Sequence, residues 1–577
     1  MDKKTLPIII LLVALIFFYY PILEFLGLYE KPAETPQQAD QTTQTDTTTG
    51  RQITAPDPET ITEAQAQIDP DISEQTGESA ADTITADTLK ITTEYYTILM
   101  SSRGGGPVSM ELKEYHYRDN GDIEMLPESR TATPDARFAG GTFSTSRLNY
   151  SSNLRPGEYD ASRDTLEVVY EYANEAGGVI RKTYWFYPDE YHFHLRFEVE
   201  NTQSFGFERS YTLWWNTPLG VTEPVPENDY QAMQAVAKLG DSRDQLDDWE
   251  GQQLRESVDG YTKWVGVRNK FFTAALIPRS REGQAAVAEG YKHQISTPDA
   301  TIEARELTAG VVMPFAGVST IADSFTVYVG PMDYLVMDDY GVDLEAMLDI
   351  GTFPFFGTLI LKPFAIAVMW LLPKLHNVIP NYGLVIIIFA ALVKIITLPL
   401  SMKQFKSMQG MKDLQPKMEE LKKKHKKDPQ ALQRETMKLY KTHGVNPMSG
   451  CLVMLPQMPL MIAMFRVFQA SILLRAEPLV WFIDDLSRGA SSFTDPYMVL
   501  VILMVAMQMV SSKLTMSGGQ QQQKAFIYIF PLVIGFLLHS LPSGLILYWT
   551  IFSAFSLLDW ALFKREKKAK NPEVKTA

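Results

Sequence analysis

The sequence predicts a multi-domain membrane protein in which six transmembrane helices accompany a large, exported, antiparallel β domain. Three observations support this fold class. Apolar runs gather at the N-terminus and after Thr352, charged residues follow the pattern of membrane topology, and the stretch between the first two apolar runs alternates with the period of β-strands. The six candidate spans are Leu6–Leu28, Tyr382–Leu400, Pro447–Ser471, Tyr497–Ser512, Ala525–Leu541 and Gly544–Phe563.

The first span and the residues after it predict a tethered domain. Leu6–Leu28 ends without the small residues of a signal cleavage site, so we expect an uncleaved anchor in residues 1–30. Residues 31–88 are acidic and poor in large apolar side chains, which predicts a disordered linker. The segments expected after it are a β-sandwich (89–350), an interfacial amphipathic helix (351–380), transmembrane helix 2 (381–401), a cytoplasmic basic helical hairpin (402–446), transmembrane helices 3 to 6 (447–563) and a basic cytoplasmic tail (564–577).

Lysine and arginine residues orient the spans. Lys3 and Lys4 precede the first span and Lys564 begins a basic tail after the last, which predicts that both termini are cytoplasmic. Residues 403–441 carry 12 basic residues against five acidic ones, a net charge of +7, so this loop is also expected in the cytoplasm. Because the whole chain has a net charge of −15, its acidic excess lies between the first two spans, and that segment is expected outside.

The exported segment has the texture of an antiparallel β-sandwich. In Tyr191–Glu200, aromatic and aliphatic residues alternate with polar ones, as in a half-buried strand. The runs Thr165–Ala173 and Val179–Tyr187 flank an Asn-Glu-Ala-Gly-Gly turn and predict a hairpin. Similar short runs recur to Val329, so the domain is expected to be mostly antiparallel.

This β segment offers few candidates for chemistry. His192 and His194 share one strand face, which suits either a metal or sugar-processing site or a solvated polar face, and no acidic cluster with ligand spacing accompanies them. Gly104–Gly106 predicts a turn, because no helix pattern opens after it. Cys451 is the single cysteine, so no intramolecular disulfide is expected and the thiol is interpreted as packing. We predict no metal site and no cofactor.

A polar groove is expected within the membrane half. Lys394 lies roughly 14 Å along a helix from the basic cluster at Lys403, too deep for easy snorkelling, and no neighbour in sequence neutralises it. A charge at that depth costs several kcal/mol unless it faces water or a partner. Gln457, Gln508 and Ser512 add polar groups in other spans, and Pro399 is expected to disrupt the Lys394 helix. The alternatives are a water-filled cavity around Lys394 or a partly snorkelling lysine.

Two further segments suit membrane and partner contacts. Phe355–Leu375 contains Lys362, Pro363 and Pro373 and would spoil the charge topology as a span, so we expect it on the outer interface. The basic loop has coiled-coil spacing interrupted at Asp428-Pro429, which predicts a helical hairpin. Fifteen of the 25 methionines lie between Met402 and Met516, which suits either a surface for varied apolar partners or ordinary core filling.

A series of motifs runs through the second half in a specific order: Leu414-Gln415-Pro416-Lys417, Leu439-Tyr440-Lys441, Asn446-Pro447, Gly450-Cys451, Gln457-Met458-Pro459, Asp495-Pro496-Tyr497, Pro542-Ser543-Gly544-Leu545 and Leu547-Tyr548-Trp549. From Asn381 to the tail the chain therefore resembles the YidC/Oxa/Alb family of membrane protein insertases, and its anchor and β domain resemble the Gram-negative form. The resemblance implies a periplasmic β-supersandwich, similar to sugar mutarotases, on a protein of the inner (cytoplasmic) membrane. It also implies a groove open to cytoplasm and lipid, with a positive residue, usually Arg, where this chain has Lys394. Lysine keeps the positive charge but lacks the planar guanidinium group with which arginine can bind a carboxylate through two parallel hydrogen bonds.

The function predicted from these observations is that of an insertase or chaperone that receives nascent hydrophobic segments in the groove and releases them into lipid, alone or with the Sec translocon. No Walker loop or catalytic motif is present, so we predict that the chain is not an enzyme. A small-solute transporter and a membrane-anchored periplasmic carbohydrate-active protein are the alternatives.

The expected partners are nascent membrane proteins, the ribosome, the Sec translocon and the lipid bilayer, with no small-molecule substrate. The expected groove residues are Lys394, Gln457, Gln508, Ser512, Tyr548 and Trp549, and the expected ribosome or lipid contacts are Lys422, Lys423, Lys424, Lys426 and Lys427.

Overall fold

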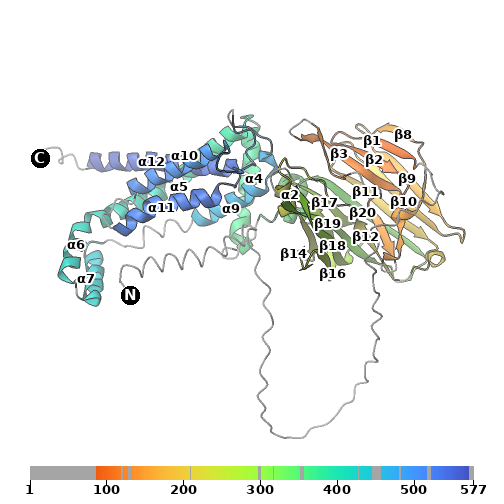
Figure 1. Cartoon of the computed structure of the whole chain (residues 1–577), viewed down its shortest axis with the longest axis horizontal. Helices are drawn as coiled ribbons and strands as arrows, with labels where there is room; N and C mark the ends of the chain where they lie inside the picture. The colour runs from red at the N-terminus through yellow and green to blue at the C-terminus, as the bar shows by residue number, and fades with distance from the viewer. Residues whose placement is uncertain are drawn as a thin grey trace, which may run out of the picture. The chain divides into compact units, whose positions relative to one another are not determined.

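The computed structural model describes residues 86–570, apart from 118–120, 128–130, 139–140, 208, 297–300, 316, 351–356, 427, 445–456, 480–481 and 516–520. The predicted anchor, most of the predicted linker, Cys451, Lys427 and residues 571–577 lie outside this part of the chain. Residues 86–577 form one compact unit, in which a β domain is followed by a set of helices (Figure 1).

The β domain contains two sheets among its described residues. The smaller has the order β4 (Asp122–Glu124), β3 (Gly106–His116), β2 (Tyr96–Ser101), β1 (Thr88–Thr92) and β8 (Gly157–Asp160). The larger follows the order β6 (Phe143–Ser144), β5 (Asp135–Phe138), β12 (Ser210–Trp215), β19 (Thr301–Pro314), β18 (Gly283–Ser296), β16 (Gln253–Arg268), β17 (Phe272–Pro278), β20 (Thr320–Pro331), β11 (His192–Glu200), β10 (Val179–Phe186), β9 (Leu166–Ala173) and β7 (Ser151–Ser152). Strands β13 (Gln234–Leu239), β14 (Ser242–Leu246) and β15 (Trp249–Glu250) join it beside β16. Of these strand pairs β1 and β8 run parallel, so the predicted antiparallel character is right in the main.

Period-two alternation places the core of this domain. In β11, Phe193, Leu195, Phe197 and Val199 are fully buried, as the sequence predicts. The predicted hairpin is confirmed, because β9 and β10 pair antiparallel and the Asn174 side chain accepts a hydrogen bond from the Gly178 amide at 2.7 Å. Short helices complete the domain: η2 (Thr145–Arg147), η3 (Thr202–Phe205), α2 (Pro226–Ala232), α3 (Tyr334–Asp338) and η4 (Leu344–Leu348).

The predicted glycine turn is also confirmed, and it has a role that sequence did not reveal. Gly104 and Gly105 have φ angles of +84° and +57° between β2 and β3, a backbone conformation that suits glycine. Their carbonyl oxygens accept hydrogen bonds at 2.8 Å from the Lys182 ammonium and the Tyr184 hydroxyl. Complete burial lowers the pKa of Lys182 to about 8. The turn therefore ties the smaller sheet to β10.

The described helices of the second part are α4 (Gly357–His376), α5 (Tyr382–Asp413), α6 (Gln415–Lys424), α7 (Pro429–Thr442), α9 (Gln457–Ala470), η5 (Ile472–Leu474), α10 (Met498–Thr515), α11 (Gln521–Leu538) and α12 (Ser543–Lys570). Tyr382–Met411 and Ser543–Arg565 are long and apolar enough to cross a bilayer, and Pro459–Ala470, Met498–Lys513 and Tyr528–Leu538 are shorter apolar helices. These five helices fall on the five predicted spans after the anchor. The count of six stays a prediction.

Helix α5 does not show the disruption at Pro399 that the sequence predicts. Pro399 does not break it, and the helix runs without interruption from Tyr382 to Asp413. A proline removes one backbone donor, and long apolar helices tolerate that loss when neighbouring groups satisfy the freed carbonyl. The second span and the start of the basic loop are therefore one helix, and the turn into α6 comes at Leu414.

Apolar side chains cover the outer faces of these helices. Ile396 on α5 is 75% exposed, and Phe536 on α11 is 64% exposed. Ile502 on α10 and Ile529 on α11 are exposed as well. Large contiguous apolar surface is rare on soluble monomers, so these faces suit lipid.

Helix α4 lies within the segment expected to be interfacial. Leu361, Ala365, Val368, Met369 and Leu372 form its buried stripe. Phe364 and Trp370 are exposed on the other side, and the Lys374 ammonium lies 3.9 Å from the centre of a Trp370 ring. An aromatic ring beside a cation is typical of a membrane interface.

Candidate functional site

A buried ion pair joins α5 and α12. The Lys394 ammonium lies 2.9 Å from Asp559 Oδ2, and the two side chains are 8% and 6% exposed. The same ammonium donates a hydrogen bond to Ser556 Oγ at 2.8 Å and lies 4.3 Å from the centre of the Phe552 ring. Lys394 thus has an acidic, a polar and an aromatic partner, all from α12.

Helical spacing explains why one helix supplies all three partners. Residues 552, 556 and 559 are four and three positions apart, so they share one face of α12. Tyr548, one turn earlier, lies on the same face with its ring centre 6.1 Å from that of Phe389 and 6.4 Å from that of Phe468. The aromatic contacts between α5, α9 and α12 therefore lie on the N-terminal side of the ion pair in both helices, since Phe389 precedes Lys394 in α5 and Tyr548 precedes Asp559 in α12.

This geometry corrects the sequence-based picture of Lys394. The sequence leaves two alternatives for the ammonium, a water-filled cavity or a partly snorkelling side chain, because no acidic residue is near it along the chain. In the structure it is buried against a partner 165 residues later. Pairing with Asp559 offsets part of the cost of burying the Lys394 charge.

The other predicted groove residues lie around α12. Gln508 on α10 accepts a hydrogen bond from Ser553 Oγ at 3.0 Å, and Ser512 lies half-buried one turn further along α10. Trp549 is half-buried beside Tyr548 on α12. Gln457 is the first residue of α9, and its side chain lies outside the described part. Helix α12 therefore presents polar groups to both α5 and α10.

The end of the bundle beside the start of α12 is closed by a hydrogen-bonded loop. The backbone amides of Ser543 and Gly544 donate to the carbonyls of Arg488 and Leu486 at 2.8 and 2.9 Å. Gly489 packs so closely that an added Cβ would lie 2.2 Å from the Ser540 carbonyl oxygen. The segment between η5 and α10 is therefore held against the turn between α11 and α12.

Two family models match the chain, "60Kd inner membrane protein" over residues 374–571 and "YidC periplasmic domain" over residues 88–365. The membrane protein insertase YidC of Prosthecochloris aestuarii is 32% identical over 503 residues, which cover 82% of this chain and 82% of that protein. The membrane protein insertase YidC of Chlorobaculum parvum is 32% identical over 501 residues and 83% of both proteins.

The chain belongs to the YidC family of membrane protein insertases. A solved crystal structure of an active YidC insertase, with its first transmembrane domain resolved, covers 82% of this chain and 91% of its own at 17% identity, with a TM-score of 0.34. Family membership makes the chain an inner membrane protein with a β-rich periplasmic domain and C-terminal helices.

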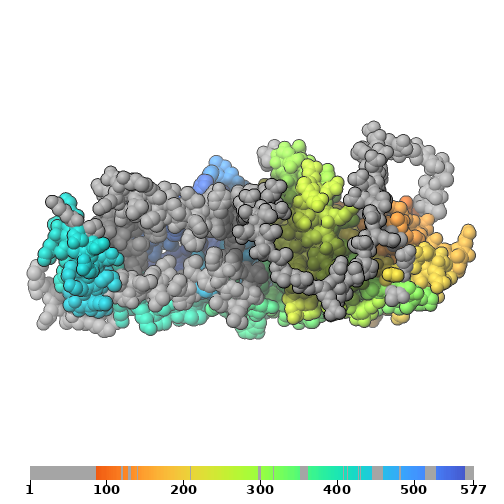
Figure 2. Space-filling model, turned by 90° about the horizontal axis from the view of Figure 1, so that it is seen from below, coloured from red at the N-terminus to blue at the C-terminus, as the bar shows by residue number. Residues whose placement is uncertain are grey.

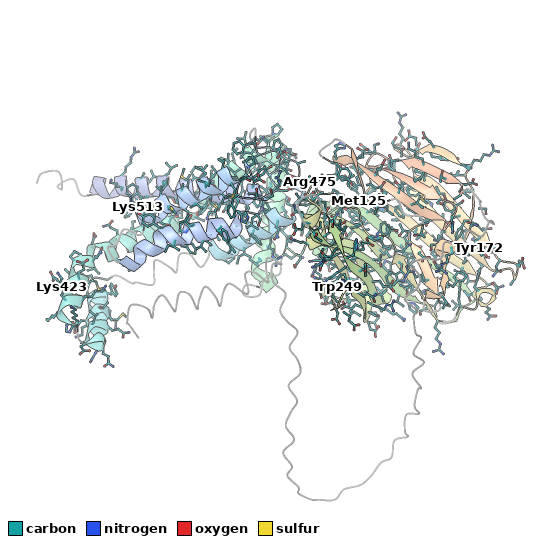
Figure 3. The ribbon with its side chains drawn as sticks, in the orientation of Figure 1. Met125, Tyr172, Trp249, Lys423, Arg475 and Lys513 are labelled. Atoms are coloured by element: carbon teal, nitrogen blue, oxygen red, sulfur yellow. The ribbon has the colours of Figure 1, made fainter. Side chains whose placement is uncertain are left out.

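The predicted basic hairpin of this YidC family member is formed by α6 and α7. Asp428 caps α7, because its carboxylate accepts hydrogen bonds at 3.0 Å from the amides of Gln430 and Ala431. Lys423, Lys424 and Lys426 are exposed and Lys422 is half-buried (Figure 3 labels Lys423). The groove between the two helices is lined by Leu421, Lys424, His425, Ala431, Arg434, Glu435 and Lys438. Figure 2 shows the surface of the hairpin in cyan.

Arg475 makes hydrogen bonds to the β domain that the sequence did not predict. It follows η5 and donates to Glu223 Oε1 at 2.9 Å, to the Thr222 carbonyl at 2.9 Å and to the His116 carbonyl at 3.2 Å, all in the β domain. Lys270 also lies 3.4 Å from Glu223. Burial nevertheless raises the pKa of Glu223, and the two cations oppose that effect. A lone arginine in a loop between apolar runs gives no sequence signal for this role.

The two strand histidines do not form a metal site. His192 Nδ1 lies 2.9 Å from the Tyr340 hydroxyl and His194 Nδ1 lies 3.3 Å from the Tyr187 hydroxyl, with the two imidazole centres 5.0 Å apart. Burial, with His194 and Arg279 nearby, lowers the pKa of His192 to about 3. The two imidazoles are therefore half-buried, whereas Arg196 and Glu200 on the same strand face are exposed, so the expected solvated face holds only for part of the strand. Throughout the described residues, no group of three or more His, Cys, Asp or Glu side chains could hold a metal ion.

Proposed function

We propose that this YidC family member inserts nascent membrane proteins by receiving their polar flanks at the polar face of α12 and releasing their apolar helices into lipid. The observation that carries the proposal is a charged and hydrogen-bonded cluster, centred on Lys394 and Asp559, inside helices whose outer faces are apolar. Polar groups at membrane depth are costly and mark functional sites in membrane proteins.

Partitioning of the client supplies the driving force. A segment of roughly twenty apolar residues gains free energy on entering the bilayer, so no nucleotide is required. The obstacle is the polar flank, which loses its hydration on the way. Hydrogen-bonding groups at Lys394, Gln508 and Ser556 replace part of that hydration and so lower the barrier.

The proposed topology has six spans, with both termini cytoplasmic and the β domain periplasmic. Lys423 lies in the last turn of α6 and Lys513 in the last turn of α10, whereas Arg475 donates hydrogen bonds to the β domain (Figure 3 labels all three). An excess of lysine at one end of the spans supports a cytoplasmic location for that end. The loop that closes the other end supports a groove shut toward the periplasm.

The proposed partners beyond client proteins are the ribosome, the Sec translocon and lipid. The exposed lysines of the α6–α7 hairpin suit anionic phosphates of RNA or of lipid headgroups. Family membership supports the prediction that the chain is not an enzyme, because the relatives carry the name of an insertase. It does not favour a small-solute transporter or a carbohydrate-active protein.

Insertion by reconstituted protein, without nucleotide, tests the proposal. We expect Lys394→Arg to retain insertion, since the charge is kept, and Lys394→Ala to impair clients whose translocated flank is acidic. Lys394→Glu should impair them further, because it places two carboxylates together at position 559 and position 394. Full activity of Lys394→Glu on such clients would contradict a role for the charge.

A further inference from the structure

Three partners surround the Lys394 ammonium. An ammonium has three protons to donate and accepts none. Asp559, Ser556 and the Phe552 ring provide three partners within 2.9 Å, 2.8 Å and 4.3 Å. The Ser556 hydroxyl is itself fixed, because it donates to the Phe552 carbonyl at 3.0 Å. A client carboxylate that approaches Lys394 therefore meets a cation that already has an acidic, a polar and an aromatic partner.

We propose that Asp559 is a specificity-determining residue that competes with the client's acidic flank for Lys394. Its carboxylate holds the place that a client carboxylate would take, so acidic flanks bind by exchange rather than by simple attraction. This inference rests on the proposed function of Lys394 as the contact for the flank. It goes beyond that function by giving the site a resident competitor and a net charge of zero.

Burial makes the competition effective. Both side chains of the pair are less than a tenth exposed, so water cannot substitute for either partner. When a client takes Lys394, Asp559 is left without its counter-charge in an apolar bundle, which is costly. Replacement of Asp559 by a client carboxylate is then favourable only when the client makes further contacts with the protein. A client that offers a single carboxylate does not displace Asp559. The pair thus keeps acidic flanks from binding too long.

The exchange also has a mechanical consequence. Lys394 belongs to α5 and its three partners belong to α12, so a client carboxylate that replaces Asp559 removes a buried contact between these helices. The Phe389 and Tyr548 rings, at 6.1 Å, remain as an apolar contact one turn and more away. Release of the client restores the pair, which favours return to the closed arrangement.

Binding of two synthetic clients to the full-length protein in detergent tests the inference. Both carry the same hydrophobic helix of about twenty residues. One has an acidic flank of Asp and Glu, and the other has the matching Asn and Gln. The readout is the affinity for the acidic client divided by the affinity for the neutral client. A general loss of the fold or of the groove lowers both affinities alike and leaves this ratio unchanged. We expect Asp559→Asn to raise the ratio in favour of the acidic client by about tenfold, which corresponds to about 1.4 kcal/mol.

Three further variants make the result decisive. Asp559→Ser offers a second uncharged side chain, and Asp559→Glu, which keeps a carboxylate, should leave the ratio near that of the parent protein. Asp323→Asn is the matched control, since Asp323 is a buried carboxylate paired with Arg281 at 2.7 Å in the β domain. It should not change the ratio.

The outcomes separate this inference from the proposed function. If Lys394→Gln lowers the ratio while Asp559→Asn and Asp559→Ser leave it unchanged, Lys394 contacts the flank but Asp559 does not compete, and the inference is overturned. If Lys394→Gln leaves the ratio unchanged, the proposed role of Lys394 itself fails. If neither uncharged variant at position 559 folds, as judged by thermal unfolding, the carboxylate serves stability alone and the inference is also overturned.

Discussion

Removing either member of the Lys394–Asp559 pair should destabilise the helical bundle, and removing both should cost less than the two single losses added together. At 2.9 Å and an effective dielectric constant of about 20, the Coulomb attraction between Lys394 and Asp559 is about 6 kcal/mol, most of which offsets their desolvation. Lys394→Ala leaves Asp559 buried without a counter-charge, so we expect a loss of about 3–5 kcal/mol in the free energy of unfolding.

A double-mutant cycle measures this coupling. Asp559→Ala should likewise cost about 3–5 kcal/mol, because it leaves the Lys394 ammonium buried without its counter-charge, and the double variant should cost less than the sum of the two single variants by about 2–3 kcal/mol. Ser556→Ala is the control, because it removes a neutral hydrogen-bond partner of Lys394 and should cost about 1 kcal/mol.

Reversible unfolding of the full-length protein in mixed micelles, followed by circular dichroism, gives these free energies. Single effects that add within about 0.5 kcal/mol would refute the reasoning, because they would mean that the two charges are hydrated separately and not paired in the bundle.

Four other predictions concern the remaining parts of the chain. Stability of the β domain should fall by about 2 kcal/mol between pH 7 and pH 5, since folded His192, with a pKa lowered to about 3, stays neutral while the unfolded chain gains a proton below about pH 6.5. His192→Gln should flatten this pH profile in urea unfolding and the hairpin control His425→Gln should not, and an unchanged slope would contradict the assignment. Replacement of Lys422, Lys423, Lys424, Lys426 and Lys427 by Gln should weaken ribosome cosedimentation and reduce its salt slope by about one for each lysine that contacts phosphate, whereas equal slopes would assign the lysines to topology. Deletion of residues 87–330 should leave insertion of reconstituted clients largely intact, and a folded, membrane-embedded variant that inserts nothing would show a direct role for the β domain. Arg475→Ala in the full chain, which removes three polar contacts with the β domain, should increase hydrogen exchange around Thr222 without loss of insertion.

Local sequence patterns are enough to predict the elements of this protein. The alternation in β11 follows from side chains that point to opposite faces of a strand, and the hairpin between β9 and β10 follows from the Asn-Glu-Ala-Gly-Gly turn between two such runs. Asp428 before Pro429 marks the start of α7 because a helix start favours both residues. The ordered motifs of the second half identify the family for the same reason, since each can be recognised along the chain.

By itself, therefore, the sequence determined the β-rich domain, the apolar helices and the basic hairpin, and it predicted a role for Lys394. The tertiary structure alone decided how charges and hydrogen-bonding groups are paired. Asp559, the partner of Lys394, stands 165 residues later, and Arg475 reaches partners more than 250 residues earlier. The continuity of α5 through Pro399 and the burial of Lys182 against the Gly104 carbonyl likewise depend on neighbouring elements. Secondary structure follows from residues within a few turns of one another, whereas the cost of burying a charge depends on which distant side chain folding brings within about 3 Å of it.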